Sequence, residues 1–315
     1  MISFIVRRLA GLLVTLLVTS FVIFGALYIA PGGPLAYLLG GRSVTPKIAA
    51  SIKHQYHLDD PFLVRYWSWL SGVLHGDLGK SLLFRQDVWS LLAPRIPTTA
   101  LLIAYASVLI IVGGVAFGVA GGLGGRLLDG ATTLVTTVSI AVPSFVAAIL
   151  LIAVFAIQLE WFPVFGSGTG FLDRVWHLTL PAVALAVIGF GFVARITRTA
   201  IREERAREHV DTARARGLPE RHVVRRHVLR NAMIPITTVS GLTVASLIAG
   251  TVVVESAFGL NGIGSFLVQA VTTKDFAIVQ DISLILVVGF VVVNTLVDVA
   301  YTLIDPRISL TRRTA

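Results

Sequence analysis

Long runs of apolar residues alternate with polar connections along this chain. Residues 9–30 form one uncharged run, and about 20 apolar residues suffice for a helix to cross the hydrocarbon core of a bilayer. A signal peptide is the alternative for this first run, but its apolar core would be only about 7–15 residues long. The pattern predicts an all-α fold with six membrane-spanning helices, over residues 9–30, 98–123, 131–157, 178–194, 236–254 and 282–304.

The first long polar segment covers residues 31–97 and is predicted to be an extracytoplasmic segment with short helices. His54 and His57 are followed by Asp59 and Asp60, and these side chains are of the types that ligate metals. No spacing in the segment fixes a third and a fourth ligand, however. A solvated turn therefore stands beside a metal site as the interpretation of the two histidines.

The second long polar segment covers residues 195–235 and is strongly basic. Eleven of the 26 Lys and Arg residues lie between Arg195 and Arg230. Because basic residues are concentrated in cytoplasmic loops, this segment is predicted to be cytoplasmic, and six spans then place both termini in the cytoplasm. Small residues beside charges, followed by a glycine that lets the chain turn, predict a short docking helix within it. Its residues are Asp211, Thr212, Ala213, Arg214, Ala215, Arg216, Gly217 and Leu218.

Composition agrees with a multi-pass membrane protein. The 315 residues are 55% hydrophobic and 14% charged, the mean hydropathy is +0.85, and soluble domains carry about 25% charged residues. The net charge of +9 is concentrated in one loop and at the ends, so it indicates membrane topology rather than nucleic-acid binding. The absence of cysteine excludes disulfides and thiolate metal sites.

Two local patterns resemble nucleotide sites but fail in context. Gly79-Lys80-Ser81 would need a glycine five positions earlier to form a P-loop, and Leu74 is found there. Residues 189–194 match G-x-G-x-x-A but lie within an apolar run without a preceding strand, so close helix packing is the better interpretation. No arrangement typical of a hydrolase is present, and the chain is not expected to be an enzyme.

Charged residues are scarce within the predicted spans. Asp298 is the one acid clearly inside a span, near the inner end of the sixth. An ion-coupled secondary transporter would call for buried coupling groups and usually for repeat symmetry. That class therefore remains as an alternative, beside a structural membrane protein.

The basic segment resembles the cytoplasmic loop of permeases from binding-protein-dependent ABC importers. Their general pattern is E-A-A-x-x-x-G, nine residues, then I-x-L-P. Asp211 and Thr212 stand for the Glu and the first Ala, whereas Ala213 and Gly217 match, and of the second element only Leu229 agrees. First-permease subunits of the peptide branch are similar along more of the chain, at residues 30–34, 58–61, 76–81, 212–218, 226–235, 254–264 and 305–307.

This resemblance implies a type I ABC importer permease fold as a single permease domain over residues 1–315, in a bacterial inner membrane. It implies a second homologous permease subunit as a heterodimer partner, two cytoplasmic ATPase subunits and an extracytoplasmic substrate-binding protein. ATP and Mg would be bound by the ATPases, so no cofactor is expected in this chain. Residues 211–218 would couple the permease to an ATPase through ion pairs and close docking of small side chains. The implied substrates are di- or oligopeptides, with nickel complexes, glutathione or another small solute as alternatives. The arginines could alternatively serve only topology and lipid headgroups.

Overall fold

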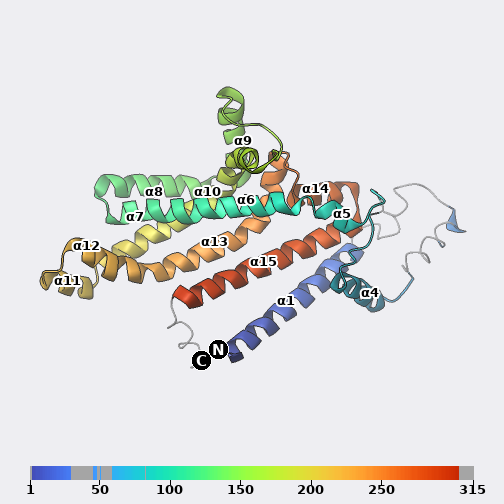
Figure 1. The fold of residues 1–315 in the computed structure, drawn as a ribbon, viewed down its shortest axis with the longest axis horizontal. Coiled ribbons are helices and arrows are strands. Elements are labelled where there is room, and N and C mark those ends of the chain that lie inside the picture. The colour runs from blue at the N-terminus through green and yellow to red at the C-terminus, as the bar shows by residue number, and fades with distance from the viewer. Residues whose placement is uncertain (1, 30–44, 48–49, 51–58, 82, 305–315) are drawn as a thin grey trace. The chain divides into compact units, whose positions relative to one another are not determined.

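The predicted all-α fold is confirmed (Figure 1). The computed structural model describes residues 2–29, 45–47, 50, 59–81 and 83–304. The chain divides into two compact units, the first formed by residues 1–98 and 261–291 and the second by residues 99–260 and 292–315. The expectation of a single permease domain over residues 1–315 stays a prediction.

Each unit is a set of helices, of which η1, η2 and η3 are π-helical segments within longer helices. The first unit contains α1 (Ile2–Ile29), α4 (Phe62–Leu74), α5 (Val88–Leu92) and α14 (Ile263–Thr273). The second contains η1 (Leu109–Gly114), α7 (Val115–Leu123), α8 (Arg126–Ala141), α9 (Ser144–Leu151), η2 (Ile152–Gln158), α10 (Phe171–Arg205), α11 (Glu208–Ala215), α12 (Glu220–Val223), η3 (Val224–Leu229) and α13 (Arg230–Ala257). The chain passes between the units within α6 (Ile96–Val108), between Leu260 and Asn261, and within α15 (Phe276–Ile304).

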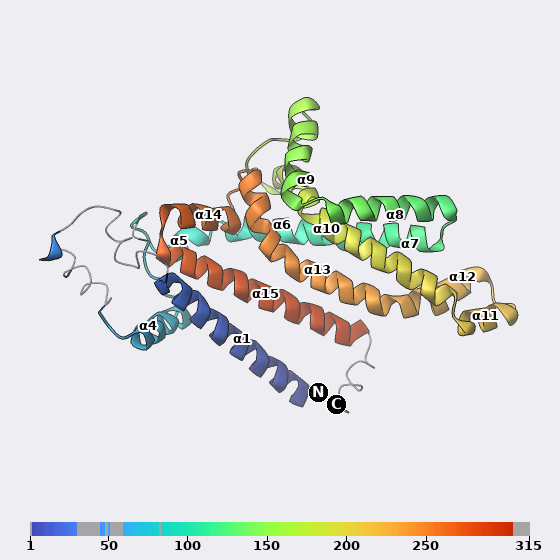
Figure 2. The same cartoon turned by 180° about the vertical axis from the view of Figure 1, so that it is seen from behind.

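Helix α10 is the centre of the second unit. It packs against η1, α7, α8, α9 and α13, and it runs between these helices in both ribbon views (Figure 2). Leu178, Leu185 and Val193 of α10 are buried together with Leu102 of α6 and Leu247 of α13. The apolar runs of the sequence therefore bury one face against α10 and form a helical bundle.

Glycines allow close contact between the helices of this bundle. A Cβ atom on Gly118 of α7 would lie 2.5 Å from the carbonyl oxygen of Ala194 on α10, and one on Gly122 would lie 2.8 Å from a side-chain atom of the same helix. A Cβ atom on Gly189 would lie 2.5 Å from a threonine of α13. The prediction that residues 189–194 serve helix packing is thus confirmed, because small residues let helix backbones approach.

The predicted third span, residues 131–157, is not one continuous helix. It is divided into α8 and the helix of α9 and η2, which are bent by 102° at a short break. Val142 and Pro143 at the break have extended ψ angles of 113° and 146°. Proline lacks the N–H of a helical hydrogen bond and disfavours the helical conformation of the residue before it, so the chain leaves the helix here.

The helix that contains the predicted fourth span, residues 178–194, extends well beyond it at both ends. Helix α10 covers 35 residues, so the predicted cytoplasmic loop of residues 195–235 begins inside a helix. Thr197 and Ile201, beyond the apolar run, are fully buried. Hydropathy locates the apolar part of a helix that lies in the membrane. It does not show that the helix continues into a polar segment, whose residues are here buried by neighbouring helices.

Several helices meet the requirements for crossing a membrane by length and composition. Four long apolar helices are found among the described residues, or five if the bent pair of α8 and α9 with η2 counts as one span. The candidates are Ile96–Leu123, Phe171–Arg205, Glu220–Ala257 and Phe276–Val297, beside the shorter apolar stretch Ala10–Ala26 of α1. The chain is therefore a multi-pass membrane protein.

The first unit has an aromatic cluster between α1 and α4. The rings of Phe24 and Tyr66 have centroids 5.7 Å apart, and Tyr66 shares a hydrogen bond of 2.9 Å with Ser20. Trp69 of α4 donates a hydrogen bond of 3.3 Å to Asp281 of α15. These contacts attach α4, a helix of the predicted extracytoplasmic segment, to both α1 and α15.

A second core of this unit joins segments that lie far apart in the sequence. Val88 and Leu92 of α5 are buried with Phe266 of α14 and Ile278 of α15. Next to them, Asp275 accepts a hydrogen bond of 2.5 Å from Ser81, across 194 positions of the chain. Ser81 belongs to the Gly-Lys-Ser tripeptide, in which Lys80 forms an isolated antiparallel bridge with Asp87.

Some predictions concern residues outside those that the structure describes. They include the candidate metal ligands His54 and His57, most of residues 31–58, and the basic tail at residues 305–315. The side chain of Asp298 is also outside the described set, although its backbone belongs to α15.

Candidate functional site

The basic segment folds into a compact helical group at one end of the second unit. It comprises the last turns of α10, then α11, α12 and η3, and the first turns of α13, and both ribbon views show α11 and α12 side by side there (Figures 1 and 2). The predicted short docking helix is α11, and its helical conformation is confirmed.

One face of α11 is fixed to the rest of the chain by apolar contacts. Val210 is fully buried and Ala213 nearly so, and residues three apart lie on one face of a helix. They pack against Val223, Val228 and Ile201 in a separate apolar core. Because this core is shared with α10 and α13, α11 has a fixed position relative to both helices.

Gly217 ends α11 in the way the sequence predicts. Its φ angle is +74°, a left-handed conformation that glycine adopts without a steric cost. The Gly217 N–H donates to the carbonyl of Arg214 at 2.9 Å, and the Leu218 N–H donates to that of Ala213 at 3.4 Å. This pair of bonds is the Schellman motif, which satisfies carbonyl groups at a helix end and reverses the chain.

Arg214 links α11 to α12. Its guanidinium donates to the two carboxylate oxygens of Glu220, at 3.2 Å and 3.1 Å, and to Asp211 at 3.2 Å. The hydrogen bond with Glu220 is the main cause that raises the pKa of Arg214 above its ordinary value. A bidentate pair restricts orientation more than a single contact does, so the link holds the turn between the two helices closed.

Glu204 holds the other end of α11. Its carboxylate lies 3.1 Å from the His209 ring nitrogen and accepts a hydrogen bond of 2.9 Å from Asn231 on α13. Arg207 approaches the same carboxylate at 3.9 Å. One acid thereby connects α10, the start of α11 and α13. Sequence reasoning missed these residues because the contact between Glu204 and Asn231 spans 27 positions without a local pattern.

Arginines on the last turns of α10 hold that helix against α7 and α8. Arg205 donates to the carbonyl of Leu123 at 3.2 Å, close to the C-terminal end of α7. Arg198 and Arg202 both pair with Asp129 of α8, the latter at 3.2 Å. A cation at the C-terminus of a helix stabilises such a contact, and so do ion pairs with a carboxylate. These interactions hold α10, which leads into α11, against α7 and α8.

The structure sorts the predicted coupling residues into two groups. Ala213 packs into the chain's own core. Arg214 pairs with Asp211 and Glu220 of the chain itself, so the contacts of both side chains in this structure are within the chain. The other members are exposed, namely Asp211, Thr212, Ala215, Arg216, Gly217 and Leu218. The surface available to a partner is therefore smaller than the whole motif.

The sequence matches two family models over most of its length. Residues 111–310 match the model for the binding-protein-dependent transport system inner membrane component. Residues 1–103 match the model for the N-terminal part of such membrane components.

Individual proteins are similar over nearly the full chain. A di/tripeptide transport system permease protein of Pseudomonas aeruginosa is 35% identical, and the match covers 98% of this chain and 99% of that protein. A glutathione transport system permease protein of Salmonella choleraesuis is 33% identical, with the same coverage.

The fold is also found among solved structures. An inward-facing structure of the MetNI methionine ABC transporter is similar with a TM-score of 0.55 and 18% identity, over 68% of this chain and 96% of that one. At this identity the likeness shows the fold alone, which is the ABC importer permease fold. The chain belongs to the family of inner membrane components of binding-protein-dependent transport systems.

Proposed function

We propose that this chain is a permease subunit of an ATP-driven importer and that α11 couples it to a partner ATPase. The observation that carries the proposal is the connection of α11 to a spanning helix, through a shared apolar core and the ion pair between Arg214 and Glu220. Arg214 binds Glu220 at the start of α12, and α12, η3 and α13 continue as one helix, Glu220–Ala257. A displacement of α11 would move this helix, which includes the predicted span of residues 236–254.

The exposed side of α11 suits docking into a groove. Thr212 and Ala215 are small, and Asp211 and Arg216 offer charges of both signs, so a partner backbone can approach closely and form directional ion pairs. ATP binding to the partner shifts the conformational equilibrium of the permease only if the docked contacts differ between its states. Because α11 shares an apolar core with α10 and α13, we expect a change in the docked contacts to be transmitted to these two helices.

The other subunits of the importer and its orientation in the membrane belong to the same proposal. Two cytoplasmic ATPase subunits hold ATP and Mg²⁺, this chain holds no cofactor, and a second, different permease completes the pathway. A binding protein delivers substrate from outside a bacterial inner membrane, and both termini are cytoplasmic. The family match supports an ATPase and a binding protein in general terms. The concentration of eleven basic residues in the α11 region supports the orientation.

The proposed substrates are di- or oligopeptides. Support comes from the name of the Pseudomonas aeruginosa relative, a di/tripeptide permease. The Salmonella relative, at a similar identity, is named a glutathione permease. Glutathione, itself a small peptide, is therefore the second candidate, and nickel complexes or another small solute follow it.

The test is co-purification and transport with the complete chain. We expect the tagged chain to co-purify with a second permease and ATPases, and proteoliposomes with the binding protein to take up peptide only with ATP. Replacing Ala215 by Trp places a bulky ring on the exposed side of α11 and should reduce ATP-dependent uptake at least tenfold. A tenfold lower rate corresponds to about 1.4 kcal/mol of activation free energy.

A matched control is Gly125→Trp. Gly125 is exposed, has an extended backbone, and a Cβ atom there would meet nothing within 4 Å. We expect this variant to transport normally. Uptake without ATP by the chain alone would contradict the proposal and support a secondary transporter. Equal uptake by the Ala215→Trp variant and the wild type would exclude α11 as the coupling element.

A further inference from the structure

A basic hollow lies along the helix that leads from α11 to the membrane. It has a volume of about 690 Å³, within the range of roughly 300–1,000 Å³ that is usual for small-molecule sites. It is lined by Pro219, Arg221, His222, Arg225, Arg226 and Arg230. These residues belong to the turn before α12, to α12, to η3 and to the first position of α13, and we call this feature the basic hollow.

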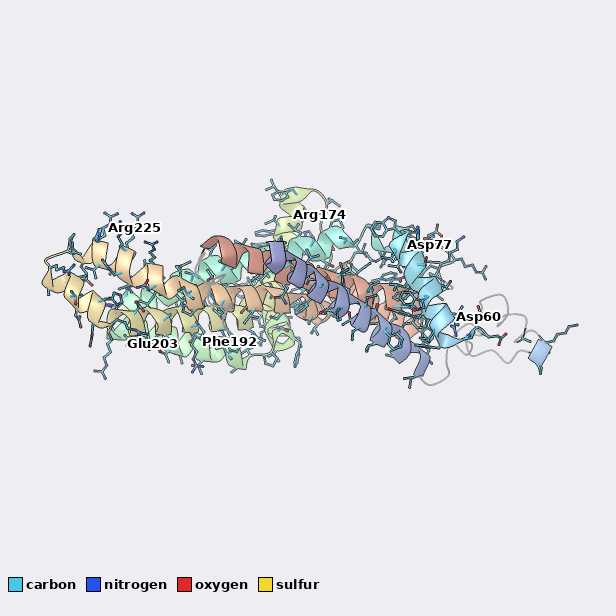
Figure 3. All side chains as sticks on the ribbon, turned by 90° about the horizontal axis from the view of Figure 1, so that it is seen from below. Asp60, Asp77, Arg174, Phe192, Glu203 and Arg225 are labelled. Atoms are coloured by element: carbon cyan, nitrogen blue, oxygen red, sulfur yellow. The ribbon has the colours of Figure 1, made fainter. Side chains whose placement is uncertain are left out.

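The opposite face of the same helix is apolar. Val223 and Val228 are fully buried and Ala232 nearly so, all in the core that α11 also joins. Arg225 and Glu203 of α10 lie on opposite sides of the helical group (Figure 3). The helix is therefore amphipathic, and its arginines are directed away from the protein core.

The arginines of the basic hollow are not neutralised by acids of the part of the chain that the structure describes. The side chains of Arg221, Arg225, Arg226 and Arg230 form no ion pair with any of the described acids and no hydrogen bond to another described residue. The neighbouring acids are used elsewhere, since Asp211 and Glu220 bind Arg214 and Glu204 binds His209. Four uncompensated guanidinium groups around one hollow favour an anion, and the planar guanidinium suits the bidentate binding of phosphate.

The position of the basic hollow indicates where such a phosphate comes from. Arg230 lies six positions before the predicted start of the fifth span at Ile236, which is about 9 Å along a helix. The headgroup layer extends roughly 5–8 Å beyond the hydrocarbon core, and a flexible arginine side chain can bridge the remaining distance. The exposed apolar side chains of Met233 and Ile234 follow directly.

We propose that the basic hollow binds the phosphate headgroup of an anionic phospholipid, such as phosphatidylglycerol. Arg226 and Arg230, nearest the span, contact the phosphate, while Arg221 and Arg225 add positive charge farther from the membrane. A bound lipid would hold the helix between α11 and the fifth span at a fixed height at the membrane surface. This goes beyond the proposed transport function, and lipid binding can be measured without transport.

The experiment uses the full chain in nanodiscs. Phosphatidylglycerol retained from mixtures with phosphatidylcholine is measured by native mass spectrometry for the wild type and for the double variant Arg226→Gln/Arg230→Gln. Basic residues at an anionic surface are each worth roughly a fivefold change in binding, so we expect roughly 30-fold weaker retention in the double variant. The matched control is Arg126→Gln/Arg195→Gln, which removes two exposed arginines outside the basic hollow. Because neither lies at the proposed phosphate site, this variant should retain the lipid as the wild type does.

Each outcome decides the proposal. Selective loss in the double variant, with unchanged thermal unfolding by circular dichroism, supports it. Equal loss in the control would show general attraction of basic residues to the membrane and overturn it. Saturable binding of inorganic pyrophosphate in discs of pure phosphatidylcholine, in competition with the lipid, would assign the basic hollow to a soluble phosphate instead. Unchanged lipid retention together with lost co-purification of ATPases would assign it to an acidic protein surface.

Discussion

At the scale of single residues, Gly217 matters through its backbone conformation rather than through its surroundings. A Cβ atom at this position would meet nothing within 4 Å, but φ is +74°. A non-glycine residue in this conformation costs about 1–2 kcal/mol. We therefore expect Gly217→Val to lower the free energy of unfolding by about that amount and to reduce ATP-dependent uptake, because the end of α11 would rearrange. Detergent titration of the purified chain, followed by circular dichroism, measures the first effect.

The control for this prediction is Gly217→Asn. Asparagine is the residue that most often replaces glycine at such helix ends, so this variant should stay close to the wild type in stability and uptake. If the valine and asparagine variants behaved alike, the left-handed conformation would not be needed for function.

Sequence reasoning worked best where a residue's role is local. The end of α11 at Gly217 was predictable, because a glycine after a run of small and charged residues leaves few alternatives. The partners of Arg214 were not, because the sequence cannot show whether an arginine faces a partner protein or an acid six positions away. The same limit hid Glu204, whose contact on α13 depends on how two helices pack.

At the scale of helices, the close contact between α7 and α10 depends on glycine residues. Gly118 lies against the backbone of α10, where a Cβ atom would approach a carbonyl oxygen to 2.5 Å. Backbone atoms cannot move aside as a flexible side chain does, so we expect Gly118→Ala to destabilise the fold by about 1–3 kcal/mol. The change in the midpoint of detergent-induced unfolding measures this effect.

The same substitution in an open place gives the control. Gly130 lies inside α8, and a Cβ atom there would meet nothing within 4 Å. Because glycine disfavours a helix, Gly130→Ala should be neutral or stabilising by about 0.5–1 kcal/mol. A stabilising effect of both substitutions would mean that α7 and α10 are farther apart than the structure shows.

The lengths and bends of helices were only partly predictable. Apolar runs in the sequence located the predicted spans. The sequence also shows a proline within residues 131–157. It does not show whether contacts with neighbouring helices keep the helix continuous at that proline. The 102° bend at this place shows that they do not keep the helix continuous. The polar end of α10 was missed because its burial depends on Gly118 and Gly122 of another helix.

At the scale of the whole molecule, α10 provides a test of the proposed orientation. A helix of 35 residues is about 52 Å long, well beyond the roughly 30 Å of the hydrocarbon core, so its two ends face opposite sides of the membrane. Arg174 is exposed near its first turn, and Ala215 is exposed on α11 soon after its last. Because the Ala215 end carries the basic segment, it should face the cytoplasm.

The natural absence of cysteine makes this prediction direct to measure. In intact cells, a membrane-impermeant maleimide should label Arg174→Cys, whereas Ala215→Cys should react only after the membrane is permeabilised. The unsubstituted chain is the control and should not react under either condition. The reverse pattern would place α11 outside, where no cytoplasmic ATPase could reach it, and would exclude the coupling role. Labelling of both positions in intact cells would mean that α10 does not cross the bilayer.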